Sequence, residues 1–502
     1  MSTETRTCAL AALTLLSFGA MANPGDTELV SVKFKSATIG YGFATGGISR
    51  EGRYVLFMSD SPAFVAGDTN GTSDVFLTDR LSGMTTRVSV GAGGVQGNGY
   101  SGWNIALSAN GRYAVFESGA SNLVARDTNG QADIFLRDVQ AGTTERVNLD
   151  SNGRPLPASF YPSITPDGRY VVFSSGSVMV RDRLTRQTTT VPSGGIAGAP
   201  VISDDARYVA LSSWGRVFLV DRTTGRRELI SRTHTGARLN ATAYPASISA
   251  DNRYVLYTTE AFNVVPNDTN GREDGFVYDR QLQTTTRVTV DNDGSQLLLG
   301  RAAQMSADGR FIAFETVKRF LDGLAVYDIM VRDRVLKTSR VVSVNSAGTL
   351  ANAGSEGPFP SGNGQFVAFS SNATNLDARD TEIYSDAYVH ELDVAAASPL
   401  SLSPTSLAFG GVVVNSTSPR KTVTVTNKGS AAISITSVRL TGADRAQFVR
   451  VRQCPAVLPA GESCTVLVSF APTSPGAKSA RLSVSIGIAG QSRSVALSGT
   501  GL

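Results

Sequence analysis

Short stretches in which apolar and polar residues alternate follow one another along most of the chain. In the first such group, "YVLFMS" (54–59), "DVFLTD" (74–79) and "TTRVSV" (85–90) are separated by bends rich in Gly, Asp and Asn. A period of two residues predicts half-buried β-strands, and bends of this composition predict hairpins between them. No segment shows a long helical period. The pattern therefore predicts an all-β protein.

A longer repeat is superimposed on this alternation. A short pattern, a small residue and then x-Gly-Arg-aromatic followed by apolar residues, recurs with variations seven times, and the residues at its Arg position are separated by 59, 57, 38, 46, 57 and 55 residues. Such steps are the length of one four-stranded propeller blade with loops of variable length. The copies are "SREGRYVLF" (49–57), "SANGRYAVF" (108–116), "TPDGRYVVF" (165–173), "SDDARYVAL" (203–211), "SADNRYVLY" (249–257), "SADGRFIAF" (306–314) and "SGNGQFVAF" (361–369).

The seventh repeat is incomplete. It runs through "DAYVHELDV" and stops before a fourth strand, whereas "TELVSV" at 27–32 matches that strand. A strand from the N-terminal end of the chain would complete the last blade and leave no unpaired edge. We predict seven blades closed by residues 27–32, with six or eight blades as the alternative.

The copies "TPDGRYVVF" and "SADGRFIAF" resemble the PD40 (WD40-like) repeats of TolB-type β-propellers, and the resemblance covers roughly residues 27–395. It implies a propeller fold. It does not imply one function, because such propellers serve as scaffolds, as partner-binding domains and as lids on enzymes.

The pattern changes in the last part of the chain. Residues 398–502 contain short alternating strands without the propeller turn, and they include "LAFG" and "PAGESCTVLVSFAPT". These motifs resemble the immunoglobulin-like choice-of-anchor D domains, which are related to the ASPM-SPD-2-Hydin family. The resemblance implies a C-terminal β-sandwich of about 100 residues.

The N-terminal segment 1–22 has the features of a secretory signal peptide, with Arg6 before an apolar run and small residues before a cleavage point after Ala22. We therefore expect export from a bacterium, to the periplasm, the cell surface or the medium. In such an oxidising setting the two remaining cysteines, Cys454 and Cys464, are expected to form a disulfide. The expected organisation is a signal peptide (1–22), a propeller (23–397) and an immunoglobulin-like domain (398–502).

Composition narrows the classes of partner. The net charge is +4 on 52.7 kDa, and no stretch gathers Lys and Arg into a basic stripe, so nucleic acid is not expected. No apolar run of about 18 residues follows the signal peptide, so the mature chain is expected to have no membrane-spanning segment. We expect a monomer that binds a protein or a cell-envelope glycan.

The segment "DTNG" occurs three times, each time followed three residues later by Asp. Counted from the first Asp, oxygen-bearing side chains lie at positions one, three and seven, as in the first half of a calcium-binding loop. However, Gly lies at position four and not at six, and the Asp at position twelve lies at the far end of the next strand. We interpret the segments as turns, with weak calcium sites as the alternative; no other cofactor is expected. The candidate calcium ligands are Asp68, Asn70, Asp74, Asp127, Asn129, Asp133, Asp268, Asn270 and Asp274.

Catalytic motifs are few. The chain has two histidines, His234 and His390, and neither the zinc motif H-E-x-x-H nor the nucleophile motif G-x-S-x-G. The Asp-Arg pairs that end a strand in five repeats, such as Asp79-Arg80, are interpreted as strand-end charges that pair with turn arginines such as Arg53 and Arg112. We nominate no catalytic residue.

Aromatic residues several positions before the repeated turns are the candidate ligand-binding residues: Trp103, Tyr161, Tyr244 and Phe359. Each would stand where an innermost strand begins, near one mouth of the central channel, although packing between blades would also explain them. The favoured function is a non-enzymatic exported binding or scaffold protein, with the immunoglobulin-like domain as spacer or attachment module. The alternative is a metal-dependent polysaccharide lyase or hydrolase.

Overall fold

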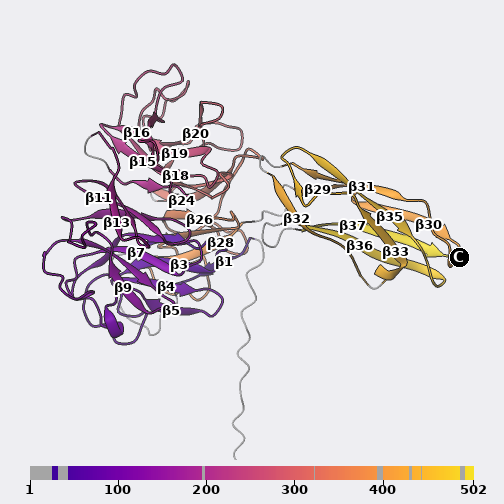
Figure 1. Cartoon of the computed structure of the whole chain (residues 1–502), viewed down its shortest axis with the longest axis horizontal. Coiled ribbons are helices and arrows are strands. Elements are labelled where there is room, and N and C mark those ends of the chain that lie inside the picture. The colour runs from indigo at the N-terminus through magenta and orange to yellow at the C-terminus, as the bar shows by residue number, and fades with distance from the viewer. Residues whose placement is uncertain are drawn as a thin grey trace, which may run out of the picture. The chain divides into compact units, whose positions relative to one another are not determined.

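The computed structural model describes residues 25–31, 43–194, 198–321, 323–392, 400–428, 432–442, 444–486 and 492–502 (Figure 1). The chain divides into two compact units, Met1–Asp393 and Val394–Leu502. The expected signal peptide, residue 32 of the expected closing strand and the expected domain boundary at 397 lie outside the described residues.

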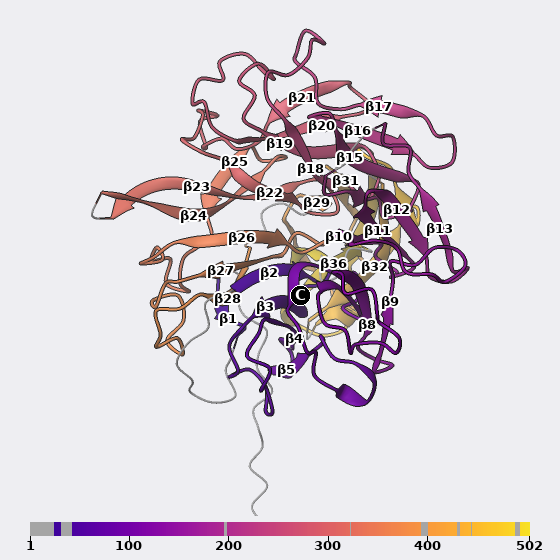
Figure 2. The same ribbon diagram turned by 90° about the vertical axis from the view of Figure 1, so that its left-hand side faces the viewer.

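The first unit consists of seven four-stranded antiparallel sheets, which are the blades of a propeller (Figure 2). A single 3₁₀ turn, Ala92–Gly94, interrupts the strands of this unit within its described residues. Blade 1 has β2 (Phe43–Ile48), β3 (Tyr54–Ser59), β4 (Asp74–Asp79) and β5 (Met84–Arg87); blade 2 has β6 (Ser101–Leu107), β7 (Tyr113–Ser118), β8 (Asp133–Asp138) and β9 (Thr143–Arg146); blade 3 has β10 (Phe160–Ile164), β11 (Tyr170–Ser175), β12 (Ser177–Asp182) and β13 (Gln187–Thr190). Blade 4 has β14 (Val201–Ile202), β15 (Tyr208–Ser213), β16 (Arg216–Asp221) and β17 (Arg227–Leu229); blade 5 has β18 (Ala243–Ile248), β19 (Tyr254–Thr259), β20 (Asp274–Asp279) and β21 (Thr284–Arg287); blade 6 has β22 (Arg301–Met305), β23 (Phe311–Leu321), β24 (Leu324–Asp333) and β25 (Thr338–Val341).

Blade 7 combines the two ends of the unit. Its strands are β26 (Ser355–Pro360), β27 (Phe366–Ser371), β28 (Asp386–Glu391) and β1 (Thr27–Leu29), and β1 pairs with β28 through Thr27 opposite His390 and Leu29 opposite Tyr388. The predicted all-β propeller of seven blades, closed by a strand from the N-terminal end, is confirmed.

The repeated turns join neighbouring blades. Gly52, in the turn of blade 1, has a φ of 76°, and a Cβ added there would lie 2.1 Å from Cδ2 of Phe366 in blade 7. Gly111, Gly168, Gly309 and Gly364 meet an aromatic ring of the preceding blade in the same way. Glycine is needed at these turns both for the left-handed backbone and for the close approach of the ring.

The turn arginines pair with the strand-end aspartates as the sequence predicts. Arg53 donates to both carboxylate oxygens of Asp79, at 2.8 and 2.7 Å, and its guanidinium stacks on the ring of Tyr54. The arginine that follows the aspartate, Arg80, stacks on Phe366 of the neighbouring blade and donates to the carbonyl of Gly52. The other anchor pairs are Arg112–Asp138, Arg169–Asp182, Arg207–Asp221, Arg253–Asp279 and Arg310–Asp333.

The second unit is a β-sandwich of a four-stranded and a five-stranded sheet (Figure 1). Inward side chains of both sheets, such as Val423, Val466, Phe470 and Leu482, form one core, as expected for an immunoglobulin-like domain. A disulfide joins Cys454 to Cys464. The sheets are β29 (Leu400–Ser403), β31 (Lys421–Asn427), β35 (Ser463–Phe470) and β33 (Phe448–Arg452), and β30 (Ser406–Val412), β37 (Ser492–Gly501), β36 (Gly476–Ile486), β32 (Ile433–Thr441) and β34 (Val457–Leu458), with a 3₁₀ turn at Arg445–Gln447.

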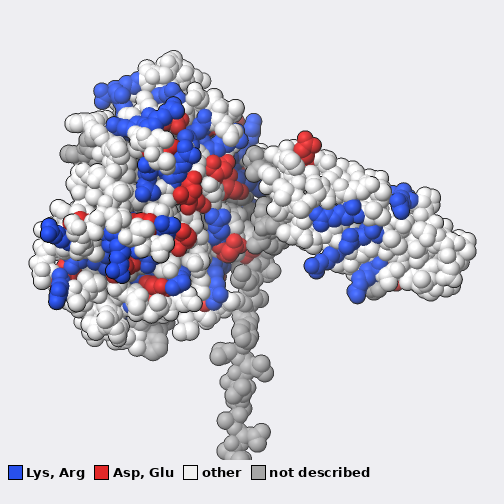
Figure 3. All heavy atoms as spheres, in the orientation of Figure 1, with Lys and Arg blue, Asp and Glu red and all other residues white. Residues whose placement is uncertain are grey.

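Charge is distributed unequally between the two units. The sequence of the second unit has ten Lys and Arg against two Asp and Glu, a net charge of +8, so the +4 of the whole chain leaves −4 on residues 1–393. Figure 3 shows Lys and Arg on the second unit with few acidic residues beside them, whereas both signs alternate on the propeller. Whole-chain charge therefore conceals a basic sandwich.

His390 lies at the point where the propeller closes. Its side chain is buried, and its Nδ1 lies 2.8 Å from Oγ1 of Thr27. Because the Thr27 hydroxyl donates its one proton to the carbonyl of Val344, in the segment between β25 and β26, His390 must be the donor in this contact. The hydrogen bond therefore connects the closing strand β1 to β28 within blade 7, and the role of His390 is structural.

The burial of His390 predicts that acid destabilises the closure of the propeller. Desolvation, together with the charge of Arg340, lowers the pKa of His390 to about 4, while Asp26 opposes the shift. Because the unfolded chain binds this proton first, the free energy of unfolding falls as the pH drops from 6.5 to about 4, by up to about 3 kcal/mol. Urea unfolding of wild type and of His390→Gln at pH 7, 5.5 and 4 measures this. The glutamine variant should show the shallower decline, and parallel declines would refute the assignment.

Candidate binding site in the central channel

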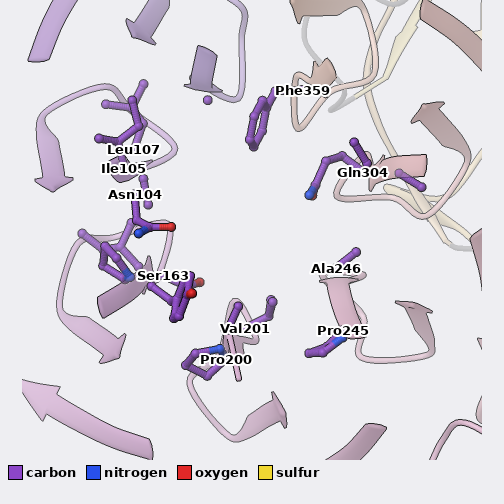
Figure 4. Close-up of a pocket in the computed structure, with 18 of the residues that line it drawn as sticks. Asn104, Ile105, Leu107, Ser163, Pro200, Val201, Pro245, Ala246, Gln304 and Phe359 are labelled. Carbon is purple, nitrogen blue, oxygen red and sulfur yellow. The ribbon is translucent and has the colours of Figure 1, made fainter. Parts of the chain in front are cut away.

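The innermost strands of the blades surround a cavity of about 550 Å³. Its lining comes from all seven blades: β2, β6, β10, the segment 199–201 that enters β14, β18, β22 and β26. Figure 4 shows side chains from these strands arranged around a common central space. We call this cavity the channel cup.

The strands around the cup are bulged, which changes where their side chains point. The register with the second strand shifts in β2, β6, β10, β18, β22 and β26. Within these shifts Tyr161 and Ala302 have φ values of 56° and 51°. A bulky residue in the left-handed region is strained, and such strain and bulges are found disproportionately beside functional sites.

The structure brings three of the four predicted aromatic residues to this cavity. Trp103, Tyr161 and Phe359 line the cup, and Tyr244 directly precedes the lining residue Pro245. Trp103 is 71 % exposed, Tyr244 54 % and Tyr161 46 %, so about half or more of the surface of each side chain is open to solvent. The ring of Trp103 rests against that of Tyr100, with centroids 5.5 Å apart.

Hydrogen bonds with neighbouring side chains fix the orientation of two amide side chains in the cup. Asn104 donates from Nδ2 to the carboxylate of Glu117 at 2.6 Å, and Ser247 donates to Oε1 of Gln304 at 2.9 Å. Burial raises the pKa of Glu117, against the hydrogen bonds from Asn104 and Tyr100. Ser163 and Thr258 add hydroxyl groups to the lining. The two amides reach toward the central space from opposite sides (Figure 4).

At one end of the channel, hydrogen bonds join the turns of neighbouring blades. The turns that follow the innermost strands hydrogen-bond to one another through Arg50 N to Ala109 O, Ala109 N to Pro166 O, Ala250 N to Ala307 O, Ala307 N to Gly362 O and Asn363 N to Arg50 O. At the same end Arg50 of blade 1 forms an ion pair with Asp204 of blade 4, at 3.1 Å, from across the ring. The cup therefore opens at the other end, where the innermost strands begin.

Exposed aromatic residues gather at the open end. Both tryptophans of the chain are there: Trp103 at the start of β6, and Trp214 in the hairpin between β15 and β16, where it is 74 % exposed and donates to the carbonyl of Gly194. Trp214 lies outside the lining of the cup. Phe262, in the loop after β19, is 60 % exposed at the same end. Phe320, in β23 near the tip of the long β23–β24 hairpin that projects in Figure 2, is 59 % exposed there.

The DTNG segments form closed, arginine-bridged turns. In blade 2 the Arg146 guanidinium lies 3.2 Å from Asp127 and 3.1 Å from Asp133, and all three side chains are almost fully buried. Asn129 accepts from the backbone N–H of Gln131 and donates to Asp133. The arginine thus lies between the two carboxylates, in the position a cation would take.

Blades 1 and 5 repeat this arrangement. Arg87 lies 3.7 and 3.2 Å from Asp68 and Asp74, and Arg287 lies 3.4 and 3.7 Å from Asp268 and Asp274. Asn70 and Asn270 donate to the aspartate of the same turn. Burial raises the pKa of Asp274 to about 6, against hydrogen bonds from Thr289 and Gln296 and the charge of Arg287. These contacts favour the turn interpretation over calcium binding.

The possible metal ligands of the chain include its two histidines. Among the described residues, no cluster of three or more His, Cys, Asp or Glu is placed to hold a metal ion. His234 is exposed in the loop before β18, and His390 is at the blade closure. In the described part of the chain, no helix has the length and hydropathy needed to cross a membrane.

Three comparisons place the chain among known proteins. A family model described as Cep192 domain 4 matches residues 397–502. The comparison with curated proteins finds no match. Among solved structures the chain is similar to oligogalacturonate lyase in complex with manganese (12 % identity, TM-score 0.48, 75 % of this chain and 100 % of that one) and to the β-propeller domain of the trilobed protease from Pyrococcus furiosus (8 %, 0.45, 69 % and 95 %). It is also similar to the Cps50 (Swd1) β-propeller domain from Myceliophteria thermophila (11 %, 0.43, 74 % and 100 %). Such identities concern the fold alone, which is a β-propeller followed by an immunoglobulin-like sandwich.

Proposed function

We propose that this chain is an exported, non-enzymatic binding protein whose propeller receives a partner at the open end of the channel cup. The observation that carries the proposal is the exposure of Trp103 and Tyr161 on the rim of a cavity lined by uncharged side chains. Large aromatic side chains left open to solvent around a concave site supply binding energy when a partner covers them.

The alternative function, a metal-dependent polysaccharide lyase or hydrolase, would need metal-coordinating side chains and a general acid or base directed into the channel. The side chains that line the cup are aromatic, aliphatic, amide, hydroxyl and proline groups. They offer stacking surfaces and hydrogen bonds, which are the means of recognition. Binding is therefore the function that these residues support best.

Substitution of an aromatic residue on the rim of the cup should weaken binding of the partner. We expect Trp103→Ala to reduce recovery of the partner from native envelope and culture medium by at least about fivefold, because a stacking surface is removed. Trp214→Ala is the matched control: it removes an equally exposed tryptophan from the same end but outside the cup. Pull-down with each tagged full chain, followed by identification of bound proteins and glycans, measures both. Full recovery by Trp103→Ala would reject the proposed site.

The sandwich is proposed as the attachment module, and its charge supports this role. Arg439, Arg450 and Arg481 are exposed, and among the described residues no ion pair with a carboxylate neutralises them. A surface of this charge is attracted to polymers that carry phosphate or carboxylate groups, and the attraction weakens as salt is added.

Replacing these three arginines by serine should lower retention of the full chain on an isolated envelope fraction several-fold at low salt. A control variant with Arg154, Arg226 and Arg272 of the propeller replaced by serine, all of them exposed, should be retained like wild type. Sedimentation of the envelope at rising salt concentration measures both. Equal retention of the two variants would show that attachment does not depend on the charge of the sandwich.

A further inference from the structure

The lining of the channel cup is neutral. Its residues include no Lys, Arg, His, Asp or Glu, and the carboxylate of Glu117 is buried behind Asn104 and engaged by it. A ligand that carried a phosphate or a carboxylate would lose its hydration there without gaining a counter-charge, which is costly. The cup therefore selects an uncharged ligand.

The cup nevertheless offers directional hydrogen bonds. An amide side chain presents both a donor and an acceptor, and a hydroxyl does the same. Among the described residues, no hydrogen bond is recorded for Nε2 of Gln304 or Oδ1 of Asn104, whereas the opposite atom of each amide is engaged by Ser247 or Glu117. Each amide is thus oriented, and its other polar atom remains available to a ligand.

Aromatic faces and oriented amides together match one kind of neutral ligand. A sugar ring has an apolar face of C–H groups, which packs on an aromatic ring, and an edge of hydroxyl groups, which both donate and accept. The flat surfaces are Trp103 and Tyr161, which Tyr100 and Phe160 support from the side. An extended peptide fits less well, because Pro162, Pro200, Pro245 and Pro360 in the lining have no backbone N–H to offer it.

We infer that the channel cup binds the end of an uncharged sugar chain. The inference rests on the proposed function and specifies its ligand. The Arg50–Asp204 pair and the tied turns obstruct the far end of the channel, so a chain enters by its terminus and does not pass through. A volume of about 550 Å³ lies within the range of roughly 300–1,000 Å³ that small-molecule sites occupy.

The two tryptophans make the test direct. In the full chain, Trp214→Phe leaves Trp103 as the sole tryptophan, so its fluorescence reports on the cup; Trp103→Phe leaves Trp214 as the matched control. Each variant is titrated with neutral oligomers of glucose and of N-acetylglucosamine, an oligomer of galacturonic acid of equal length, and an uncharged proline-containing peptide.

We expect saturable changes of Trp103 emission with at least one neutral oligomer, and binding of the acidic oligomer weaker by about tenfold or more. The Trp214 signal should not change, and adding Gln304→Ala should weaken binding between about twofold and tenfold. The inference is overturned if no neutral oligomer changes Trp103 emission, or if the acidic oligomer or the peptide binds at least as tightly. If it fails while recovery of a partner still depends on Trp103, only the ligand class is wrong.

Discussion

Replacing Gly52 by alanine is expected to lower the free energy of unfolding by about 3 kcal/mol, measured by urea denaturation. Two effects combine. The backbone at this turn has a φ of 76°, and the new Cβ would lie 2.1 Å from the ring of Phe366. The first costs roughly 1–2 kcal/mol and the overpacking typically 1–3 kcal/mol. Because Gly52 joins blade 1 to blade 7, the loss falls on the closure of the ring.

Gly71→Ala separates the two effects. Gly71 has a similar φ of 65°, but nothing lies within 4 Å of the position its Cβ would take. We expect a loss of about 1 kcal/mol from backbone strain alone. If both variants lost the same stability, contact between the turns and the neighbouring rings would not hold the blades together.

Removing the arginine from a DTNG turn is expected to cost about 3–5 kcal/mol, because two buried carboxylates lose their counter-charge. Arg146→Met is the variant of choice, since Arg146, Asp127 and Asp133 are all less than a tenth exposed. The variant should also gain a dependence on calcium: with Asp127, Asn129 and Asp133 left around an empty position, millimolar calcium should restore part of the lost stability.

Thermal unfolding in calcium and in chelator provides the measurement. Wild-type curves should coincide, whereas those of Arg146→Met should separate; Arg154→Met, at an exposed position, controls for the substitution itself. A wild-type protein stabilised by calcium as strongly as the variant would mean that the ion binds without displacing the guanidinium, and the turn interpretation would then be wrong.

The fold could be predicted because the residues that build the blades are the ones that repeat. Glycine occupies the position of Gly52 in five of the seven turns, and arginine occupies the position of Arg53 in six, so these residues reveal the number and phase of the blades. The partner of the DTNG turns was missed, although the chain contained a signal for it. Arg87, Arg146 and Arg287 occupy the same strand position in the three blades with DTNG, whereas blades 3 and 4, which lack it, have Thr190 and Leu229 there.

The candidate site was only partly predictable. The aromatic residues before four of the turns could be recognised, but Asn104 and Gln304 could not, because bulges in β6 and β22 break the alternation from which inward positions are counted. The pair Arg50–Asp204 joins turns of two distant blades and has no local pattern. The basic character of residues 394–502 was masked because charge was summed over the whole chain, where the acidic propeller offsets it.

The pairing of β1 with β28 also determines when the propeller can close during synthesis of the chain. Thr27 and His390 are 363 residues apart, and a chain made from its N-terminus must leave Thr27 unpaired until nearly the whole propeller has been synthesised. Closing so long a loop is slow and comes late in folding. A chain truncated before β28 has no partner for β1, so its first and last blades stay open to proteases. Complete copies of the propeller are therefore expected to resist proteases better than copies truncated before β28.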